Sequence, residues 1–214
     1  MDTALIVLAK APEASKSRLA AAIGADAAAR VAAALLKDAL RRAEDSGLRP
    51  RTLSWKGPGG HPWRDRAAAR GWRIVPQPSG DLGARMREAL ADALARAPRA
   101  LLLGTDCPDL DARLLVRAAR WLDGADVVLG PARDGGYVLI GAARRALPHL
   151  DHLFFGIRWG NADVAATTRA RAADCGLVMR ETEPLRDLDD ADDLGALAAR
   201  HPFLAGYGEK INRT

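Results

Sequence analysis

The chain alternates short aliphatic runs with longer segments in which apolar residues recur every three or four positions. The short runs predict buried strands, and the longer segments predict helices with one apolar face. The predicted strands cover residues 4–9, 52–55, 73–75, 100–103, 126–129, 137–140 and 176–179. The predicted helices cover residues 26–45, 61–70, 84–97, 111–122, 161–173 and 190–199. This alternation indicates an α/β fold of three layers, in which helices cover a mostly parallel sheet.

No feature of the sequence divides the chain into two domains. Its 214 residues exceed the usual size of one small domain but are too few for two full ones. The sequence contains neither an internal repeat nor a linker rich in Pro, Gly or Ser. The strand at 100–103 is expected at the centre of the sheet, and residues 149–152 are expected to be an irregular surface stretch. We therefore expect a single domain over residues 1–214.

The composition is that of an ordinary globular protein, with 49% hydrophobic and 28% charged residues, which excludes a disordered chain. No apolar run approaches the roughly 20 residues of a membrane span, and the first residues do not resemble a secretory signal. The two cysteines, Cys107 and Cys175, are too few for a disulfide scaffold and fall in segments predicted to be interior. We expect a cytoplasmic protein with free thiols and no membrane partner.

The basic residues are distributed unevenly between the two types. The formal net charge is +5, but only five of the 32 basic residues are lysines, and two of these, Lys10 and Lys16, fall in one short loop. Lysine is a compact point charge that suits a phosphate approached from one side, although a genome rich in G and C would also favour arginine elsewhere. Aromatic residues make up 5% of the chain and do not interleave with a basic stripe, so no nucleic-acid partner is expected.

Polar residues that directly follow predicted strands are the candidates for a binding site, because ligands of open α/β sheets bind beyond the carboxyl ends of the strands. The loop after the first strand carries three cations, Lys10, Lys16 and Arg18. Together with backbone amides, these groups can hold phosphate oxygens. The loop lacks the glycines of a Walker motif, and its alternative interpretation is a solvated cap on the next helix.

A second candidate loop covers residues 77–86. It combines Gln77, whose amide can hydrogen-bond the edge of a base, with Gly80 and Gly83, which allow close approach of the backbone. The alternative is a plain turn in which Asp81 lies near a helix N-terminus.

The strongest local signal is Gly-Thr-Asp-Cys-Pro at 104–108, where a hydrophobic strand ends in the carboxylate of Asp106. Mg²⁺ and Mn²⁺ prefer carboxylate and phosphate oxygens, so Asp106 is a candidate metal ligand. The second carboxylate would come from Asp187 or Asp189, although Asp189 also suits a helix cap. Cys107 is not expected to be a nucleophile, because no histidine lies in a comparable loop to activate it.

Six short motifs occur in a fixed order along the chain. They are Lys-Ser-Arg-Leu at 16–19, Gly-Asp-Leu-Gly-Ala-Arg-Met at 80–86, Gly-Thr-Asp-Cys-Pro-Asp-Leu at 104–110, Pro-Ala-Arg-Asp-Gly-Gly-Tyr at 131–137, Gly-Ile-Arg-Trp at 156–159 and Asp-Leu-Asp at 187–189. Over nearly the whole chain this combination resembles the bacterial GT-A-type glycosyltransferase-like proteins, also known as rSAM/selenodomain-associated transferases. That family shares the Rossmann-like fold of nucleotide-diphospho-sugar transferases with molybdenum-cofactor guanylyltransferases and phospholactate guanylyltransferase.

The resemblance implies a transferase that uses a nucleotide-bound donor and Mg²⁺ or Mn²⁺. The residues that it assigns to the donor are Lys10, Lys16, Arg18, Gln77, Gly80, Gly83 and Arg85. The metal ligands would be Asp106 and, as the second ligand, Asp189. The residues that it places at the acceptor are Asp134, Gly135, Gly136, Tyr137 and Trp159. The catalytic residues would be Lys16, Asp106 and Asp134.

Two parts of the sequence match different relatives within this superfamily. The loop before Lys16 is short and resembles that of phospholactate guanylyltransferase, whereas Asp-Gly-Gly-Tyr at 134–137 is similar to the glycosyltransferase-like proteins. We expect glycosyl transfer from a nucleotide sugar to a small acceptor. The alternatives are nucleotidyl transfer to a phosphorylated small molecule with release of pyrophosphate, and nucleotide binding without turnover. A homodimer is compatible with the sequence.

Overall fold

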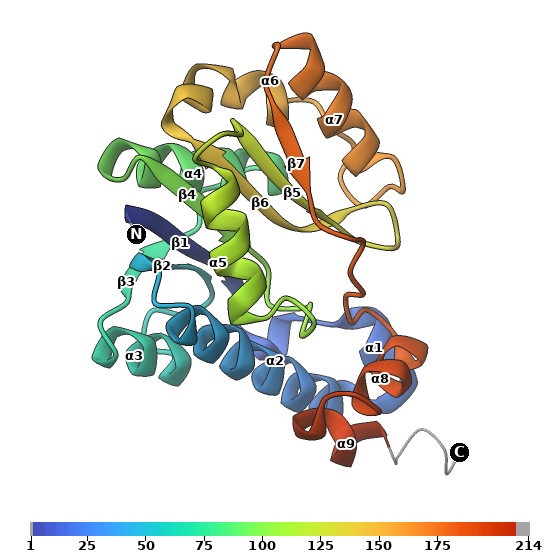
Figure 1. Ribbon diagram of the computed structural model, residues 1–214. Helices are drawn as coiled ribbons and strands as arrows, with labels where there is room; N and C mark the ends of the chain where they lie inside the picture. Colours follow the sequence, from blue (N-terminus) through green and yellow to red (C-terminus); the bar gives the residue numbers. More distant parts are fainter. Residues whose placement is uncertain (1, 209–214) are drawn as a thin grey trace.

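The computed structural model describes residues 2–208 and contains a twisted seven-stranded sheet between layers of helices (Figure 1). The strands are β1 (Asp2–Lys10), β2 (Arg49–Lys56), β3 (Arg73–Pro76), β4 (Arg99–Leu103), β5 (Val127–Pro131), β6 (Tyr137–Ala143) and β7 (Met179–Glu181). Their order is β3-β2-β1-β4-β6-β5-β7, and β4 is central as expected. Only β6 runs antiparallel to its neighbours, β4 and β5. The expected α/β class and mostly parallel sheet are confirmed.

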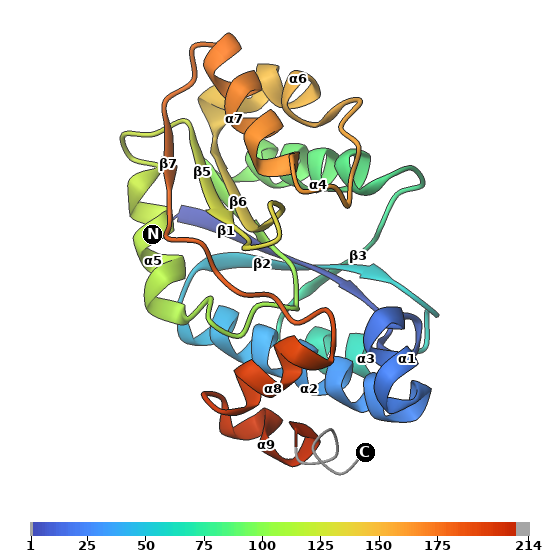
Figure 2. The ribbon, with the colours of Figure 1, turned by 90° about the vertical axis from the view of Figure 1, so that its right-hand side faces the viewer.

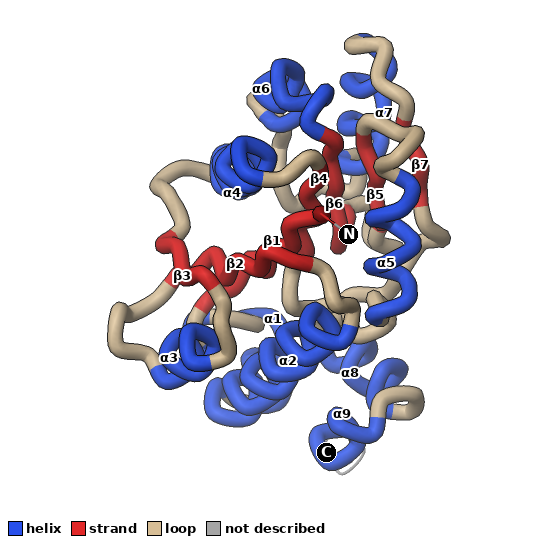
Figure 3. Tube along the Cα trace, turned by 60° about the vertical axis from the view of Figure 1, so that its left-hand side comes forward, coloured by secondary structure: helices blue, strands red, loops and turns tan. Residues whose placement is uncertain are grey.

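Helices cover both faces of the sheet (Figures 1 and 3). They are α1 (Ser17–Ile23), α2 (Ala25–Asp45), α3 (Pro62–Ala69), α4 (Leu82–Arg96), α5 (Ala112–Trp121), α6 (Leu150–Phe154), α7 (Val164–Asp174), α8 (Ala191–Ala198) and α9 (Pro202–Gly208), with 3₁₀ turns at Pro12–Ala14 and Arg144–His149. Helices α4, α6 and α7 lie on one face, and α2, α3 and α5 lie on the other. Over residues 2–208, no helix is long and apolar enough to cross a bilayer.

The hydrophobic core forms on both faces because the side chains of a strand alternate in direction. In β1, Leu5 and Val7 pack under α2 and α5, whereas Ile6 packs under α4. A third apolar cluster joins α1 and α2 to the C-terminal helices α8 and α9 (Figure 2). Its buried members include Leu19, Leu35, Leu188, Leu194 and Leu204. The first and last parts of the chain are therefore packed together.

Aspartates fix the points at which three helices begin. The Asp81 carboxylate accepts the backbone N–H of Ala84 at 2.8 Å, and the Asp111 carboxylate accepts that of Leu114 at 2.7 Å. Asp190 caps α8 in the same way. Such caps stabilise a helix by about 1 kcal/mol and set its first residue. The interpretation of Asp81 as a residue at a helix start is thus confirmed.

Several short elements differ from the sequence-based expectation. Helices α1, α6 and α9 have five to seven residues each, which is too short for a clear apolar period. The stretch at 149–152 was expected to be irregular and at the surface; Asp151 and His152 are exposed, but the stretch is helical, since it enters α6, where Leu150 and Leu153 are buried under the sheet. The last strand also begins later than predicted, at Met179, because Gly176 adopts a φ of +66° and turns the chain first.

Candidate functional site

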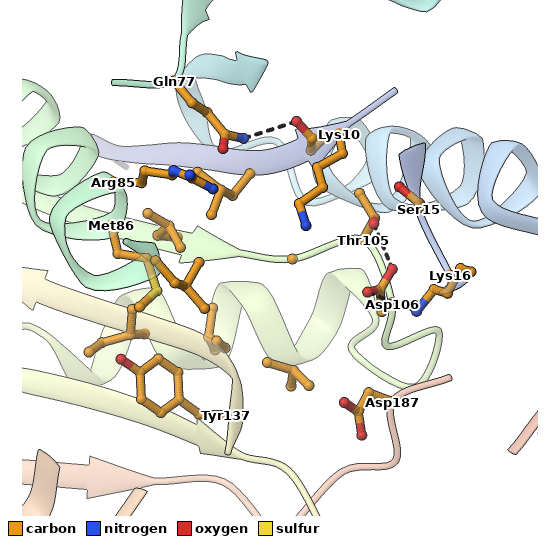
Figure 4. A pocket seen from close by; sticks show the side chains of 18 of the residues that line it. Lys10, Ser15, Lys16, Gln77, Arg85, Met86, Thr105, Asp106, Tyr137 and Asp187 are labelled. Carbon is orange, nitrogen blue, oxygen red and sulfur yellow. Dashed lines mark hydrogen bonds and ion pairs between the residues drawn. The ribbon is translucent and has the colours of Figure 1, made fainter. Parts of the chain in front are cut away.

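A cavity of about 410 Å³ opens at the carboxyl ends of β1 and β4 (Figure 4). Because β6 is antiparallel, its first residue, Tyr137, lies at this same edge. Of the residues predicted for the site, those that line the cavity are Lys10, Lys16, Gln77, Arg85, Asp106, Tyr137 and Asp187, the last being one of the two candidates for the second carboxylate. Arg18, Asp134 and Asp189 lie outside its lining, and Trp159 lies behind Tyr137. The cavity therefore joins residues from five candidate segments, namely 10–18, 77–86, 104–110, 131–137 and 187–189.

The loop after β1 turns sharply so that Lys16 points back toward the sheet. The backbone of Lys16 has a φ of 60°, and no other non-glycine residue among residues 2–208 has a positive φ. The Lys16 carbonyl accepts the N–H of Ala20 at 2.8 Å, so the strained residue also begins α1. A left-handed conformation costs an L-residue about 1–2 kcal/mol. Here it places the lysine side chain, 3% exposed, at the edge of the cavity.

The Lys16 ammonium joins two loops that are far apart in the sequence. Its Nζ lies 2.8 Å from Asp106 Oδ2 and 3.4 Å from Asp189 Oδ1, and it donates to the carbonyl of Leu188. Thr105 Oγ1 donates to Asp106 Oδ1 at 2.8 Å, and the Leu188 N–H donates to the Asp106 carbonyl at 2.8 Å. Both oxygens of the Asp106 carboxylate are thus engaged by neighbouring side chains.

Three aspartates form an acidic cluster beside this lysine. Asp134, Asp187 and Asp189 each place a carboxylate oxygen within 4.8 Å of those of the other two. Burial, together with the negative charges of Asp134 and Asp189, raises the pKa of Asp187 to about 6. The sequence left the choice between Asp187 and Asp189 open, and the structure brings both to the cluster. Asp106, the other predicted metal ligand, lies across Lys16 from Asp189 and outside this trio.

Gln77 is fixed at the opposite end of the cavity. Its Nε2 donates to the carbonyls of Ala9 and Ser54, at 2.9 Å each. Because both amide protons are used, Oε1 is the group that Gln77 can offer to a ligand. Arg85 donates from Nη2 to the Gly80 carbonyl at 2.7 Å. In Figure 4 the side chains of Lys10 and Arg85 extend into the space near Gln77, so this end presents cations beside an acceptor.

The two glycines predicted to contact the donor have structural reasons of their own. Gly80 has a φ of +109°, in a region that L side chains rarely adopt. A Cβ on Gly83 would lie 2.6 Å from the Trp159 ring and 2.7 Å from the Phe154 carbonyl oxygen. The Trp159 ring meets Tyr137 edge-on, with centroids 6.1 Å apart. Gly83 therefore allows Trp159 to pack against α4 and support the wall that contains Tyr137.

The loop at 134–137 is held rigidly at the other side of the acidic cluster. Asp134 Oδ1 accepts the N–H of Gly136 at 2.9 Å, and the carbonyl of Gly135 accepts the N–H of Ala165 near the start of α7 at 2.9 Å. Gly135 has a φ of +91°, and a Cβ there would lie 2.6 Å from the Ala162 carbonyl carbon. Only glycine fits this contact, which fixes the position of Asp134.

Comparison with known proteins identifies the family. Residues 39–161, more than half of the chain, match the family described as "Uncharacterized protein conserved in bacteria (DUF2064)". The chain belongs to this family. No curated protein matches the sequence of this DUF2064 protein.

Solved structures establish the fold of the DUF2064 protein. A candidate nucleotide-diphospho-sugar transferase from Desulfovibrio desulfuricans G20 aligns with a TM-score of 0.88 and 27% identity, over 99% of this chain and 97% of that one. CMP:2-keto-3-deoxy-manno-octonic acid synthetase complexed with CTP aligns with a TM-score of 0.60 and 12% identity, over 94% and 99%. Rv0371C of Mycobacterium tuberculosis H37Rv in complex with manganese aligns with a TM-score of 0.55 and 18% identity, over 92% and 98%. The expected fold and the transferase class are confirmed.

One supporting residue of the DUF2064 protein had no signal in the sequence. Arg42 of α2 is 4% exposed and pairs through Nε with Asp38 Oδ2 at 2.7 Å. Its Nη1 donates to the carbonyls of Cys107, at 2.9 Å, and Leu110. Arg42 therefore anchors the loop that follows Asp106, yet nothing distinguishes it from the other 26 arginines in the sequence.

The cysteines of the DUF2064 protein are free, as expected, but only one is fully buried. Cys107 is 3% exposed, and burial raises the pKa of its thiol to about 12. A thiol in that state is neutral near pH 7 and is a poor nucleophile. Cys175, which was also expected to be interior, is half-buried because it ends α7 at the turn around Gly176.

Proposed function

We propose that this DUF2064 protein transfers a glycosyl group from a nucleotide sugar to a small acceptor and that it requires Mg²⁺ or Mn²⁺. The observation that carries the proposal is the order of groups along one sheet edge. A cavity of about 410 Å³ runs from Gln77 to Lys16 and ends beside the three clustered aspartates. Its volume lies within the range of small-molecule sites, and its two ends suit a base and a diphosphate.

The donor would lie along the cavity. Gln77, Lys10 and Arg85 would surround the base, because they supply a fixed acceptor and two cationic donors at the end of the cavity away from Lys16. Lys16 and Arg18 would face the phosphates, since both side chains carry their charge to the opposite end, near Asp189. The CTP that the structurally similar synthetase holds supports a nucleotide as the ligand of this cavity.

The residues present fit a divalent cation. The cluster of Asp134, Asp187 and Asp189 offers only carboxylate oxygens, the ligands that Mg²⁺ and Mn²⁺ prefer. Burial first, and then the charges of Asp134 and Asp189, raise the pKa of Asp187, so a bound cation would favour the ionised form of this carboxyl. When bound, a divalent ion would neutralise charge on the leaving diphosphate. Asp106 would complete the site from the far side of Lys16, and the manganese complex of Rv0371C supports the choice of ion.

The acceptor would approach from the loop at 134–137. Asp134 is exposed, and its carboxylate is oriented by the Gly136 N–H, so we propose that it contacts the acceptor hydroxyl. Gly135 and Gly136 would lie beneath the bound acceptor. Tyr137, supported by Trp159, would separate the acceptor from the donor cavity.

Nucleotidyl transfer to a phosphorylated acceptor is the second candidate. It is favoured by the similarity to nucleotidyltransferases, among them a protein of Methanothermobacter that aligns with a TM-score of 0.60 over 95% of this chain. The buried Lys16 beside Asp106 also suits the phosphates of a triphosphate. The two reactions differ in their products, because glycosyl transfer releases a nucleoside diphosphate and nucleotidyl transfer releases pyrophosphate.

The first experiment is a thermal-shift panel of nucleotides and nucleotide sugars, each with and without Mn²⁺. Binding to the native state raises the melting temperature, so the panel identifies the donor. The selected donor is then incubated with candidate acceptors, and nucleoside diphosphate and pyrophosphate are measured separately. Release of diphosphate supports glycosyl transfer, release of pyrophosphate supports the second candidate, and a shift without either product indicates binding alone.

Asp106→Ala tests the site assignment in the same assay. We expect it to lower kcat/KM at least about 100-fold, because it removes a charged group that acts in the transition state. Asp151→Asn is the matched control, since Asp151 is an exposed carboxylate paired with Arg87 at 2.6 Å, away from the cavity. Full activity of Asp106→Ala would refute the assignment.

A further inference from the structure

The Lys16 ammonium is surrounded by groups that would also suit a metal ion. Its contacts are the carboxylate oxygens of Asp106 and Asp189, at 2.8 and 3.4 Å, and the carbonyl oxygen of Leu188. The side chain is 3% exposed, so this charge is largely removed from water. Such an ammonium must be compensated by its neighbours. The acidic groups Asp106 and Asp189 compensate it.

The aspartates at the site therefore fall into two groups, those paired with Lys16 and those that are not. Lys16 compensates Asp106 and Asp189, while Asp134 and Asp187 form no ion pair among the residues that the structure describes. Figure 4 shows Lys16 beside Asp106, with Asp187 across the intervening space. Asp189 links the two groups, because it contacts Lys16 and also contributes to the acidic cluster.

We propose that Lys16 is an internal cation that occupies the acidic edge of the site until donor and metal ion arrive, and that donor binding draws its ammonium from Asp189 toward a donor phosphate. This inference rests on the proposed function, which supplies the phosphate and the divalent ion. Lys16 then couples the two binding events. While the Lys16 ammonium neutralises Asp189, the site attracts a divalent cation weakly. When the ammonium moves away, the Asp189 carboxylate regains its uncompensated negative charge and can bind the cation.

The local structure allows this movement without unfolding the loop. The Lys16 backbone is fixed because its carbonyl begins α1 and its N-terminal neighbour, Ser15, donates to the Ala11 carbonyl at 3.2 Å. The ammonium is carried on four flexible methylenes, so it can change partners while the backbone stays in place. Asp189 is released more readily than Asp106, because its distance to Nζ is longer by 0.6 Å.

The test is the affinity for Mn²⁺ alone, without nucleotide, followed by the electron paramagnetic resonance signal of free Mn²⁺. We expect Lys16→Met to bind Mn²⁺ at least about tenfold more tightly than the wild type, because it removes a buried positive charge next to two carboxylates. Arg18→Met is the matched control. It removes the same charge 3.4 Å from Asp189, but the Arg18 side chain is 72% exposed, so solvent screens it and we expect a change within about twofold.

Two further variants keep the test decisive. Lys16→Arg retains the charge and is expected to bind Mn²⁺ within about threefold of the wild type. Lys16→Gln, which is neutral but can still donate to Asp106, replaces Lys16→Met if the latter does not fold. It is likewise expected to bind Mn²⁺ at least about tenfold more tightly than the wild type. Folding is checked by thermal melting before each titration.

The outcomes separate this inference from the proposed function. If the wild type binds Mn²⁺ and a folded, neutral variant at residue 16 binds it equally or more weakly, the coupling role of Lys16 is refuted while the metal site stands. If neither wild type nor variant binds Mn²⁺ at millimolar concentration, the proposed metal site is wrong and the inference falls with it. Tighter Mn²⁺ binding by both Lys16→Met and Arg18→Met would also refute the coupling role of Lys16. The increase in affinity would then come from the loss of any nearby positive charge.

Discussion

Gly135→Ala is expected to destabilise the protein by about 2–5 kcal/mol. One part of this cost is conformational, because Gly135 has a φ of +91°, where an L side chain costs about 1–2 kcal/mol. The other part is steric, because the new Cβ would lie 2.6 Å from the Ala162 carbonyl carbon. This neighbour is backbone, so it cannot rotate away, and overpacking of this kind costs about 1–3 kcal/mol. For a chain of 214 residues, the sum lowers Tm by roughly 4–20 °C.

Two other glycines separate these contributions. Gly160 has a φ of +87°, but no atom lies within 4 Å of an added Cβ, so Gly160→Ala carries the conformational cost alone, about 1–2 kcal/mol. A Cβ on Gly136 would approach only the Asp134 side chain, at 3.2 Å. The assay is urea unfolding followed by circular dichroism, with the free energies compared at equal m-values. Equal losses in Gly135→Ala and Gly160→Ala would refute the rigid contact between the 134–137 loop and Ala162.

Three further predictions concern ionisable and buried groups. The pKa of Asp187 is raised to about 6 in the folded state, so without metal the folded protein holds this proton more tightly than the unfolded chain does. The free energy of unfolding should therefore fall as pH rises from about 4 to 6. Asp187→Asn should flatten this part of the profile of urea midpoint against pH, and an unchanged slope would contradict the assignment. Cys107, buried and with its pKa raised to about 12, should resist iodoacetamide at pH 8 in the native protein while the half-buried Cys175 reacts, as mass spectrometry of the peptides would show. Arg42→Met should cost about 1.5–3 kcal/mol in urea unfolding, because it removes one of the two arginines that pair with buried Asp38, the other being Arg41, together with the charged donor to the Cys107 and Leu110 carbonyls. A loss below about 1 kcal/mol would show that these contacts are unimportant.

The sheet and its long helices could be predicted because local signals agree with the tertiary structure. The strand that became β4 is an unbroken aliphatic run, and β4 is buried on both faces at the centre of the sheet. Helix α2 has a regular apolar stripe, and Asp81 and Asp111 mark the starts of α4 and α5. Helix α6 carried no such signal, because it has five residues and is stabilised by packing under the sheet.

Site residues that directly follow a strand could be predicted from the sequence. Residues whose position depends on how distant segments pack together could not. Lys16 and Asp106 were identified by their positions after β1 and β4, and the structure brings them within 2.8 Å. The sequence could not decide between Asp187 and Asp189, because their directions are set by the Leu188 N–H, which donates to the Asp106 carbonyl. Arg42 gave no signal, since only the folded chain shows which arginine of a helix is buried. The roles of these residues in donor and metal binding stay predictions.

The bond from Lys16 to the Leu188 carbonyl joins residues that are 172 positions apart in the sequence. Closing a loop of that length is entropically costly and slow relative to local pairing, so this contact belongs to a late stage of folding. On the ribosome, β1 and the Lys16 loop emerge long before their acidic partners have been synthesised. A nascent chain that ends before residue 187 would therefore carry a lysine without its carboxylate and carbonyl partners from this segment, and the acidic edge would be assembled only after residues 187–189 have been synthesised.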